Sequence, residues 1–307
     1  MAKKPALIIL SFLFFVNVIA GLAAWELSKA DSLEVDFFDV GQGDAIFIKT
    51  ASGHQILIDA GPDSTILEKL GSKMPFWDRT IDLVVLTHPE KDHLAGLLEV
   101  LKKYQVENIL WTGVIRDIAE FKEWERLIKE EKAEIKIAKA GLKIIFPSAK
   151  PSSSSSFIAS RILDIPGGVP PAIEVLYPFD NLAGQGFKDS NNTSIVSKLV
   201  FGRVVFLFTG DISASVEKEI GGREDIDIRA EVLKVSHHGS IYSTSEEFLQ
   251  KVLPQIAVIF AGQDNPYGHP AKEILARLKN QQVFVTAENS DVFCRTDSKT
   301  IDCRGSR

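Results

Sequence analysis

The sequence is poor in the features that mark disordered, disulfide-rich or nucleic-acid-coating proteins. It has only 13 prolines among 307 residues and 45% hydrophobic residues, a composition that permits a sizeable folded core. Its formal net charge of −6 provides no general basic field for phosphate backbones, so nucleic-acid contact would depend on a local basic patch or on bound metal ions. No Gly-x-Ser-x-Gly segment occurs, which argues against a serine nucleophile.

Cysteine is scarce as well. The two cysteines, Cys294 and Cys303, lie close together near the C-terminus, and the residues around them do not form a zinc-ribbon spacing. In an oxidising compartment this pair can close a disulfide across a terminal hairpin. Two free thiols are the alternative.

One long hydrophobic run stands at the N-terminus. A lysine pair precedes residues 6–24, where Asn17 is the only strongly polar side chain, and this length is close to the roughly 20 residues that a spanning helix needs. The run exceeds the usual signal-peptide core of about 7–15 residues, so residues 1–30 are predicted to be a transmembrane anchor. A signal segment cut near residues 20–24 and a buried N-terminal helix are the alternatives.

The anchor and the cleaved signal would both place residues 31–307 outside the cytoplasm. The positively charged flank before the run prefers the cytoplasmic side of a membrane, and the residues after the run are then translocated. We therefore expect an external domain, which is either held at the cell membrane by a single pass or secreted.

Short apolar strands alternate with helical segments through this domain, which indicates an α/β fold. Strand patterns fall at residues 35–38, 45–48, 55–58, 82–86, 108–111, 172–176, 194–200, 204–208, 228–235 and 256–260, with further pieces within 135–145. Helical patterns follow His93 and cover residues 118–132, 246–252 and 271–278. The stretch 147–168, with serines at positions 152–156, is predicted to be a flexible surface insertion without a catalytic role.

Polar residues that suit catalysis follow several of these strands. Loops at strand ends are where scaffolds place chemistry, because side chains from several strands can converge there. Most of the chain's 6 histidines belong to this set, and His54 is the one outside it. The set comprises Asp59, the cluster His88, Glu90, Asp92 and His93, the pair Asn191 and Asn192, Asp211, the pair His237 and His238, and His269.

Imidazole and carboxylate groups in one set predict a divalent metal centre. Neutral imidazole and ionised carboxylate are the ligands that suit Zn²⁺ or Mn²⁺. Two such ions close together would share a water molecule whose pKa falls toward neutrality, which makes it a nucleophile at physiological pH. Taken singly, His88 or Asp211 would more often be a structural residue, but the ordered set favours a metal-dependent hydrolase.

The segment His88-x-Glu90-x-Asp92-His93 resembles the His-x-His-x-Asp-His signature of the metallo-β-lactamase superfamily, with an acid in place of the second histidine. Over roughly residues 35–284 the chain is similar to the extracellular, C-terminal hydrolase-like domain of ComEC-type competence proteins. The segments that carry this likeness are Asp39-Val40-Gly41-Gln42-Gly43-Asp44-Ala45, Leu57-Ile58-Asp59-Ala60-Gly61, Thr87-His88-Pro89-x-x-Asp92-His93, Asn191-x-x-Ser194, Thr209-Gly210-Asp211, Leu233-Lys234-Val235-x-His237-His238-Gly239-Ser240 and Asn265-Pro266-Tyr267-Gly268-His269-Pro270.

The resemblance implies a four-layered αββα metallo-β-lactamase fold and assigns roles to the polar set. Catalysis is expected to depend on Asp92 and Asp211. The implied metal ligands are His88, Glu90, Asp92, His93, Asp211 and His237, with His238 as the competing choice for the last position. The implied substrate-binding or orienting residues are Asp59, Asn191, His238 and His269.

The resemblance allows one or two divalent ions. In the family pattern His88 and Glu90 serve one ion, the Asp-His pair that ends the signature serves the other, and Asp211 bridges them. Asn191 occupies the segment where many members supply another histidine, which weakens the first position. The larger share of oxygen donors shifts the expected preference from Zn²⁺ toward Mn²⁺.

Phosphodiester hydrolysis, with DNA as the substrate, is the activity that the resemblance implies. ComEC-type proteins are large membrane channels that carry this domain as an appendage, so a stand-alone version is expected here. Hydrolysis of another ester, a lactone or a phosphocholine ester is one alternative. A non-catalytic module that binds DNA or a surface polymer through a degenerate metal site is the other.

Overall fold

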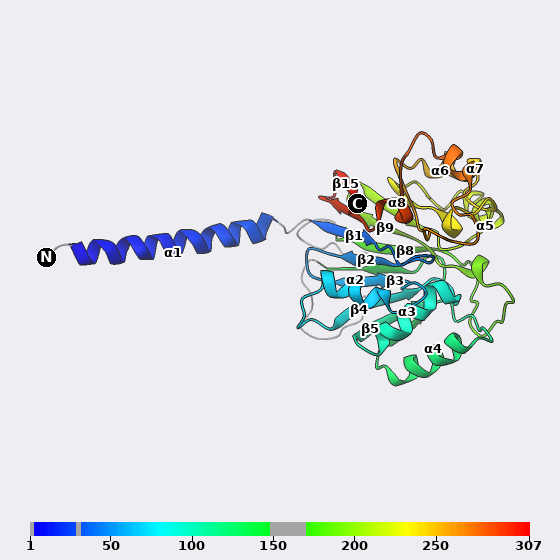
Figure 1. Cartoon of the computed structure of the whole chain (residues 1–307), viewed down its shortest axis with the longest axis horizontal. Helices are drawn as coiled ribbons and strands as arrows, with labels where there is room; N and C mark the ends of the chain where they lie inside the picture. Colours follow the sequence, from blue (N-terminus) through cyan, green and yellow to red (C-terminus); the bar gives the residue numbers. More distant parts are fainter. Residues whose placement is uncertain (1–2, 29–31, 148–169) are drawn as a thin grey trace.

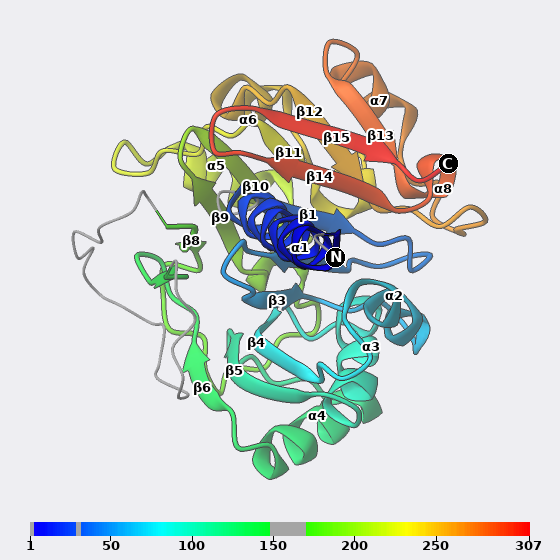
Figure 2. The same ribbon diagram turned by 90° about the vertical axis from the view of Figure 1, so that its left-hand side faces the viewer.

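The computed structural model describes residues 3–28, 32–147 and 170–307. From Leu33 onward, strands and helices build two facing β-sheets with helices on their outer sides (Figures 1 and 2). The serine run at 152–156 and the surface insertion predicted around it lie outside the described residues.

The first sheet has eight strands in the order β15-β14-β1-β2-β3-β4-β5-β6. Its members are β1 (Leu33–Phe37), β2 (Ile46–Lys49), β3 (Gln55–Ile58), β4 (Thr80–Leu86), β5 (Gln105–Trp111), β6 (Glu134–Ile137), β14 (Val292–Thr296) and β15 (Ile301–Gly305). Strands β3 to β6 are parallel, so the loops that follow them leave the sheet at one edge.

The second sheet has seven strands in the order β13-β12-β11-β10-β9-β8-β7. Its members are β7 (Lys143–Ile145), β8 (Ala172–Tyr177), β9 (Val196–Phe201), β10 (Val204–Phe208), β11 (Val232–Lys234), β12 (Ile256–Ile259) and β13 (Gln282–Val285). Strands β10 to β13 are parallel, so their carboxyl ends also share an edge.

Three apolar cores divide the domain into four layers. Side chains that alternate along each strand point to opposite faces, so Phe206 and Phe208 of β10 join the core between the sheets while Leu207 faces outward. The outer core of the first sheet is covered by α2 (Thr65–Lys73), α3 (Lys91–Leu101) and α4 (Ala119–Glu130). The outer core of the second sheet is covered by α5 (Ala214–Gly221), α6 (Glu246–Val252) and α7 (Lys272–Arg277). The predicted αββα arrangement is confirmed.

The remaining helices of the two-sheet domain are short and lie at the ends of strands. They are η1 (Asn191–Thr193), η2 (Ser236–Gly239) and α8 (Thr286–Asn289). Two of them carry residues from the polar set, because η1 precedes β9 and η2 follows β11.

The N-terminal run forms α1 (Lys3–Ser28), which stands clear of the two sheets in Figure 1. Residues 9–21 are exposed, so the alternative of a helix buried in the domain is wrong. Over the described ranges, no helix reaches the combination of length and apolarity that is needed to cross a membrane. The structure therefore does not support the transmembrane helix predicted within residues 1–30.

Two local differences from the predicted elements have clear causes. Residues 228–235 were predicted as one strand, but only Val232–Lys234 is a strand, because the Ala230 N–H donates to the Val252 carbonyl of α6 and not to a neighbouring strand. Helices α2 and α5 were not predicted. Both are short and contain glycine and serine, which weaken the helical pattern in the sequence.

The predicted C-terminal disulfide is present. Cys294 on β14 and Cys303 on β15 face each other in the antiparallel register and are bonded. Both side chains are buried and contribute to the core between the sheets. The cross-link therefore ties the edge hairpin to the centre of the domain.

Replacing both cysteines with alanine should lower the free energy of unfolding by about 2–3 kcal/mol, because the bond closes a short loop in the unfolded chain. Guanidinium denaturation followed by tryptophan fluorescence measures the loss. The wild-type protein unfolded with a reductant is the control and should lose a similar amount. Rapid alkylation of the folded wild type before any reductant is added would contradict the bond.

Candidate metal centre

Side chains from both sheets meet at the edge where β3, β4, β10 and β11 end. Asp59 follows β3, His88 follows β4 by one residue, and Asp211 follows β10. His238 lies on η2, directly after β11, and His93 lies in the first turn of α3. The parallel strands thus bring together residues that are far apart in the sequence.

A close contact between α3 and the loop after β3 fixes the start of that helix. The Gly96 N–H donates to the Gly61 carbonyl at 2.9 Å, and the Ala60 N–H donates to the His93 carbonyl at 3.0 Å. A Cβ at position 96 would lie 1.9 Å from the Ala60 carbonyl oxygen, so only glycine permits this approach. The approach brings His93 Nδ1 within 2.8 Å of Asp59 Oδ2.

Four buried residues, Asp44, His93, Asp211 and His238, form a group of potential metal ligands. One ligand atom from each lies within 4.8 Å of the others. The Asp211 Oδ2 atom lies 3.3 Å from His93 Nε2 and 3.2 Å from His238 Nε2. Both imidazoles therefore face the same carboxylate oxygen.

Three imidazole Nε2 atoms in this region are buried and lack a hydrogen-bond partner. They are the Nε2 atoms of His88, His93 and His238. Leaving a buried polar group unpaired costs about 1–3 kcal/mol, and a bound cation removes that cost for a ligating nitrogen. With the nearby carboxylates, these nitrogens match the donors that zinc and manganese take, so the residues fit a divalent metal.

Asp59 holds the far side of the His93 ring. It accepts hydrogen bonds from the Thr87 N–H at 2.8 Å and from the Thr87 hydroxyl at 2.6 Å. The Nδ1 atom of His238 lies 3.2 Å from the Phe260 carbonyl in the same way. Contacts at Nδ1 leave Nε2 of each ring for a ligand. The orienting role of Asp59 stays a prediction, and this geometry favours it.

Asp92 reaches the same imidazoles from the first turn of α3. Its Oδ2 atom lies 3.4 Å from His238 Nε2 and 4.0 Å from His93 Nε2. Its side chain is 35% exposed, whereas that of Asp211 is 3% exposed. Asp92 therefore marks the side on which the buried group opens to solvent.

Glu90 has partners other than those expected of a metal ligand. Its Oε1 atom accepts from the Ser190 N–H at 3.1 Å and from the Ser190 hydroxyl at 2.6 Å. Its Oε2 atom accepts from Arg116 Nη2 at 3.0 Å, and Arg116 Nη1 donates to the Phe187 carbonyl at 2.7 Å. The structure thus places Glu90 in a link between α3 and two loops, outside the four-residue group.

Asn191, His237 and His269 surround the group without joining it. The His237 Nε2 atom lies 3.4 Å from Asn191 Nδ2, and the His237 and His269 rings meet edge to face at 5.9 Å. His237 and His238 both have positive φ angles, of 50° and 56°. Of the two candidates that the sequence left open, the structure brings His238 and not His237 to Asp211.

Two charged residues of the site, Asp44 and Lys234, were not predicted. Asp44 lies between β1 and β2, and Lys234 ends β11 with a fully buried side chain. The Lys234 ammonium contacts Asp44 and lies 3.2 Å from Asp211 Oδ1. The available signal was a lysine within an otherwise apolar strand, since a lysine is almost never fully buried without a partner.

The excess of carboxylates controls protonation in the group. Burial alone would lower the pKa of His238, but the neighbouring carboxylates, Asp211 first, raise that pKa to about 9. Burial also opposes ionisation of Asp211, yet His238 and Lys234 hold its pKa well below the usual range. By contrast, burial and a neighbouring imidazole keep the pKa of His88 well below 6.5. A field that protonates a buried imidazole also attracts a metal cation, which must displace that proton.

A cavity of about 310 Å³ lies in front of the group. Its lining combines four acids, Glu90, Asp92, Asp189 and Asp211, with the basic side chains of Arg116 and Lys188. Tyr267 also lines it and is 68% exposed, with its ring stacked on His269 at 5.7 Å. The cavity therefore joins the carboxylates to cationic and aromatic groups.

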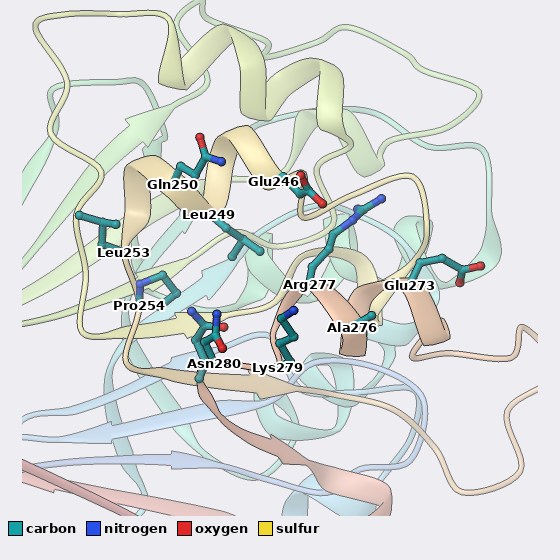
Figure 3. A pocket seen from close by; sticks show the side chains of 11 residues that line it. Glu246, Leu249, Gln250, Leu253, Pro254, Glu273, Ala276, Arg277, Lys279 and Asn280 are labelled. Atoms are coloured by element: carbon teal, nitrogen blue, oxygen red, sulfur yellow. The ribbon is translucent and has the colours of Figure 1, made fainter.

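A larger cavity of about 710 Å³ lies elsewhere, beside α6 and α7 (Figure 3). Glu246 and Leu249 of α6 and Arg277 of α7 line it, and no histidine, cysteine or aspartate is among its lining residues. It lacks the donors of a transition-metal site. The metal chemistry therefore belongs to the smaller cavity.

The two facing sheets and this site define the class of the protein. The sequence profile of the metallo-beta-lactamase superfamily matches residues 38–263, and the chain belongs to this superfamily. The metallo-beta-lactamase fold protein YhfI from Bacillus subtilis has a similar structure, with a TM-score of 0.50 and 14% sequence identity. That match covers 87% of this chain and 100% of YhfI, and it concerns the fold.

Competence proteins are among the relatives. The chain is 29% identical over 284 residues to ComE operon protein 3 of Bacillus subtilis (strain 168), which covers 85% of this chain and 33% of that protein. It is 26% identical over 270 residues to competence protein ComA of Neisseria gonorrhoeae, with 86% and 32% covered. The chain thus spans about a third of the length of these relatives. The predicted resemblance to ComEC-type proteins is confirmed.

Replacing His238 with alanine should lower metal affinity by roughly 10–100-fold, because it removes a nitrogen that faces Asp211. The matched control is His237→Ala, which should keep near wild-type metal content since His237 lies outside the group. Elemental analysis of the purified proteins after dialysis measures this difference. Metal loss in the His237 variant alone would reverse the assignment.

Replacing Glu90 with glutamine should cost about 1–3 kcal/mol of stability, because the charged link to Arg116 is broken. Metal content should stay near the wild-type value. Thermal melting and elemental analysis test the two statements. Glu123→Gln, which breaks an exposed pair with Arg126, is the control and should change little. Unchanged stability with lost metal would mean that Glu90 is a ligand.

Proposed function

We propose that this protein is a metal-dependent phosphodiesterase that hydrolyses DNA. One observation carries the proposal: the Nε2 atoms of His88, His93 and His238 are buried without a hydrogen-bond partner, and two of them lie 3.2–3.3 Å from Asp211 Oδ2. Imidazole and carboxylate donors in such a group hold catalytic zinc or manganese ions.

The buried group would hold the metal through His93, His238 and Asp211, with Asp92 on the cavity side. A bound divalent ion would supply Lewis-acid chemistry and make water a nucleophile near neutral pH. Asp59 and the Phe260 carbonyl keep the two rings oriented with Nε2 toward the ion. His237, whose pKa is lowered by burial, is neutral at pH 7 and can accept a proton at Nε2.

The cavity lining supports an anionic substrate that carries bases. Lys188 supplies positive charge, and the Arg116 guanidinium lines the same cavity while it pairs with Glu90. The exposed Tyr267 ring offers a face on which a base can stack, an interaction that tolerates any sequence. One of the similar proteins is named a competence protein, and this supports DNA over other phosphodiesters.

We further propose that the domain acts outside the cytoplasm, at the membrane or after secretion. The Cys294–Cys303 bond supports this location, because disulfides persist in oxidising compartments. The exposed apolar side chains of α1 and the lysines before them support a membrane as the partner of that segment.

The purified full-length protein should hydrolyse single-stranded DNA and bis-p-nitrophenyl phosphate when Mn²⁺ is added, and a chelator should abolish both activities. Asp211→Asn should lower both rates by roughly 100-fold or more, because it replaces the carboxylate between two imidazoles with a neutral amide. Asp227→Asn, at an exposed pair with Arg229, is the matched control and should retain activity.

Other outcomes distinguish the alternatives. Hydrolysis of carboxylic esters, lactones or phosphocholine esters without any cleavage of DNA would assign the same site to a different ester. DNA binding without hydrolysis of any substrate in Mn²⁺ or Zn²⁺ would make the protein a binding module. Full activity of the Asp211 variant would contradict the metal-centre assignment.

A further inference from the structure

We propose that the Lys234 ammonium takes the place of a second metal ion, so that the site holds one divalent ion per chain. This inference rests on the proposed metal-dependent function and concerns how that centre is built. It assigns a role to a buried lysine that the metal-ligand pattern does not contain.

The surroundings of Lys234 leave none of its hydrogen-bonding capacity unused. Its side chain is 0% exposed. Its Nζ atom donates to the Gly210 carbonyl at 2.7 Å and to Asp211 Oδ1 at 3.2 Å, and it also contacts Asp44 Oδ2. The three partners match the three N–H bonds of an ammonium group, so the charge is fixed in place.

The two oxygens of the Asp211 carboxylate have different partners. The Oδ1 atom pairs with Lys234, while Oδ2 faces His93 Nε2 and His238 Nε2. A carboxylate that bridges two metal ions through both of its oxygens gives one oxygen to each. Here the oxygen that would reach a second ion is already bound to a permanent positive charge.

The other residues expected at a second ion are also engaged or unsuited. Both Glu90 oxygens accept hydrogen bonds from Arg116 or Ser190. Asn191 offers an amide where an imidazole would be needed, and its Nδ2 atom faces His237. His88 alone keeps an unpartnered donor for that position. A single imidazole does not make a site.

Charge balance supports one ion in place of two. The carboxylates of Asp44, Asp59 and Asp211 are buried, and Asp92 lies at the opening beside them. With Lys234 and one divalent ion, these four acids keep a single net negative charge. A second divalent ion would leave an uncompensated positive charge among buried imidazoles, which the low-polarity interior disfavours.

The test counts Mn²⁺ ions in the full-length wild-type protein by elemental analysis and records its electron paramagnetic resonance spectrum. One ion per chain without exchange coupling is the expected result. Two ions with an exchange-coupled signal would overturn the inference and leave the metal-dependent function intact. No bound ion at saturating Mn²⁺ would overturn both.

Variants then test whether Lys234 is the cause. Lys234→Met should raise the count from one ion toward two, whereas Lys234→Arg, which keeps the charge, should stay at one. Lys198→Met is the matched control, because Lys198 lies in the same sheet, is largely buried and pairs with Glu174 away from the site. It should stay at one ion.

Folding is checked by circular dichroism. If Lys234→Met does not fold, Lys234→Gln, which removes the charge but keeps hydrogen-bond donors for the Gly210 carbonyl and Asp211, should also admit a second ion. A folded variant that lacks the ammonium and still binds one ion would overturn the role of Lys234. If neither variant folds, a wild-type count of two ions still overturns the inference, and Lys234→Arg tests whether the positive charge keeps the count at one.

Discussion

The mutual repulsion of carboxylates is the constraint on which this site depends. Asp44, Asp59 and Asp211 are buried, and a carboxylate moved from water into a protein interior costs several kcal/mol unless cations compensate it. The structure supplies that compensation through Lys234 and through imidazoles whose protonated forms the acids stabilise. A divalent ion satisfies the same field with ligands that are already in place.

The two sheets make this arrangement possible because each contributes part of it. Asp44 and Asp59 come from loops of the first sheet, whereas Asp211 and Lys234 come from adjacent parallel strands of the second. The carboxylates and the ammonium meet only when the core between the sheets holds the two edges together. The tight approach at Gly96 then sets His93 between Asp59 and Asp211.

The α/β alternation and the edge of the site could be predicted from local patterns, because apolar strands followed by polar residues identify where parallel strands end, whereas the four-layered arrangement was implied by the family resemblance. The choice of side chains could not. Glu90 pairs with Arg116, which lies 26 residues away on another loop, and no local sequence pattern near either residue indicates that contact. His238 was distinguished from His237 only by the backbone at η2, where both residues have positive φ angles that no local sequence pattern indicates. Such choices depend on how loops from different strands pack.

Stability and metal binding are separable in this architecture. A structural zinc site closes its coordination sphere and supplies folding energy, whereas a catalytic site keeps one side open. Here three apolar cores and a disulfide stabilise the domain, and the ligand group opens at Asp92 onto a cavity. A fixed ammonium at Asp211 further reduces the repulsion that would remain when the ion leaves. A metal at this position would therefore contribute chemistry to a domain whose stability comes from its apolar cores, its disulfide and its own buried ion pairs.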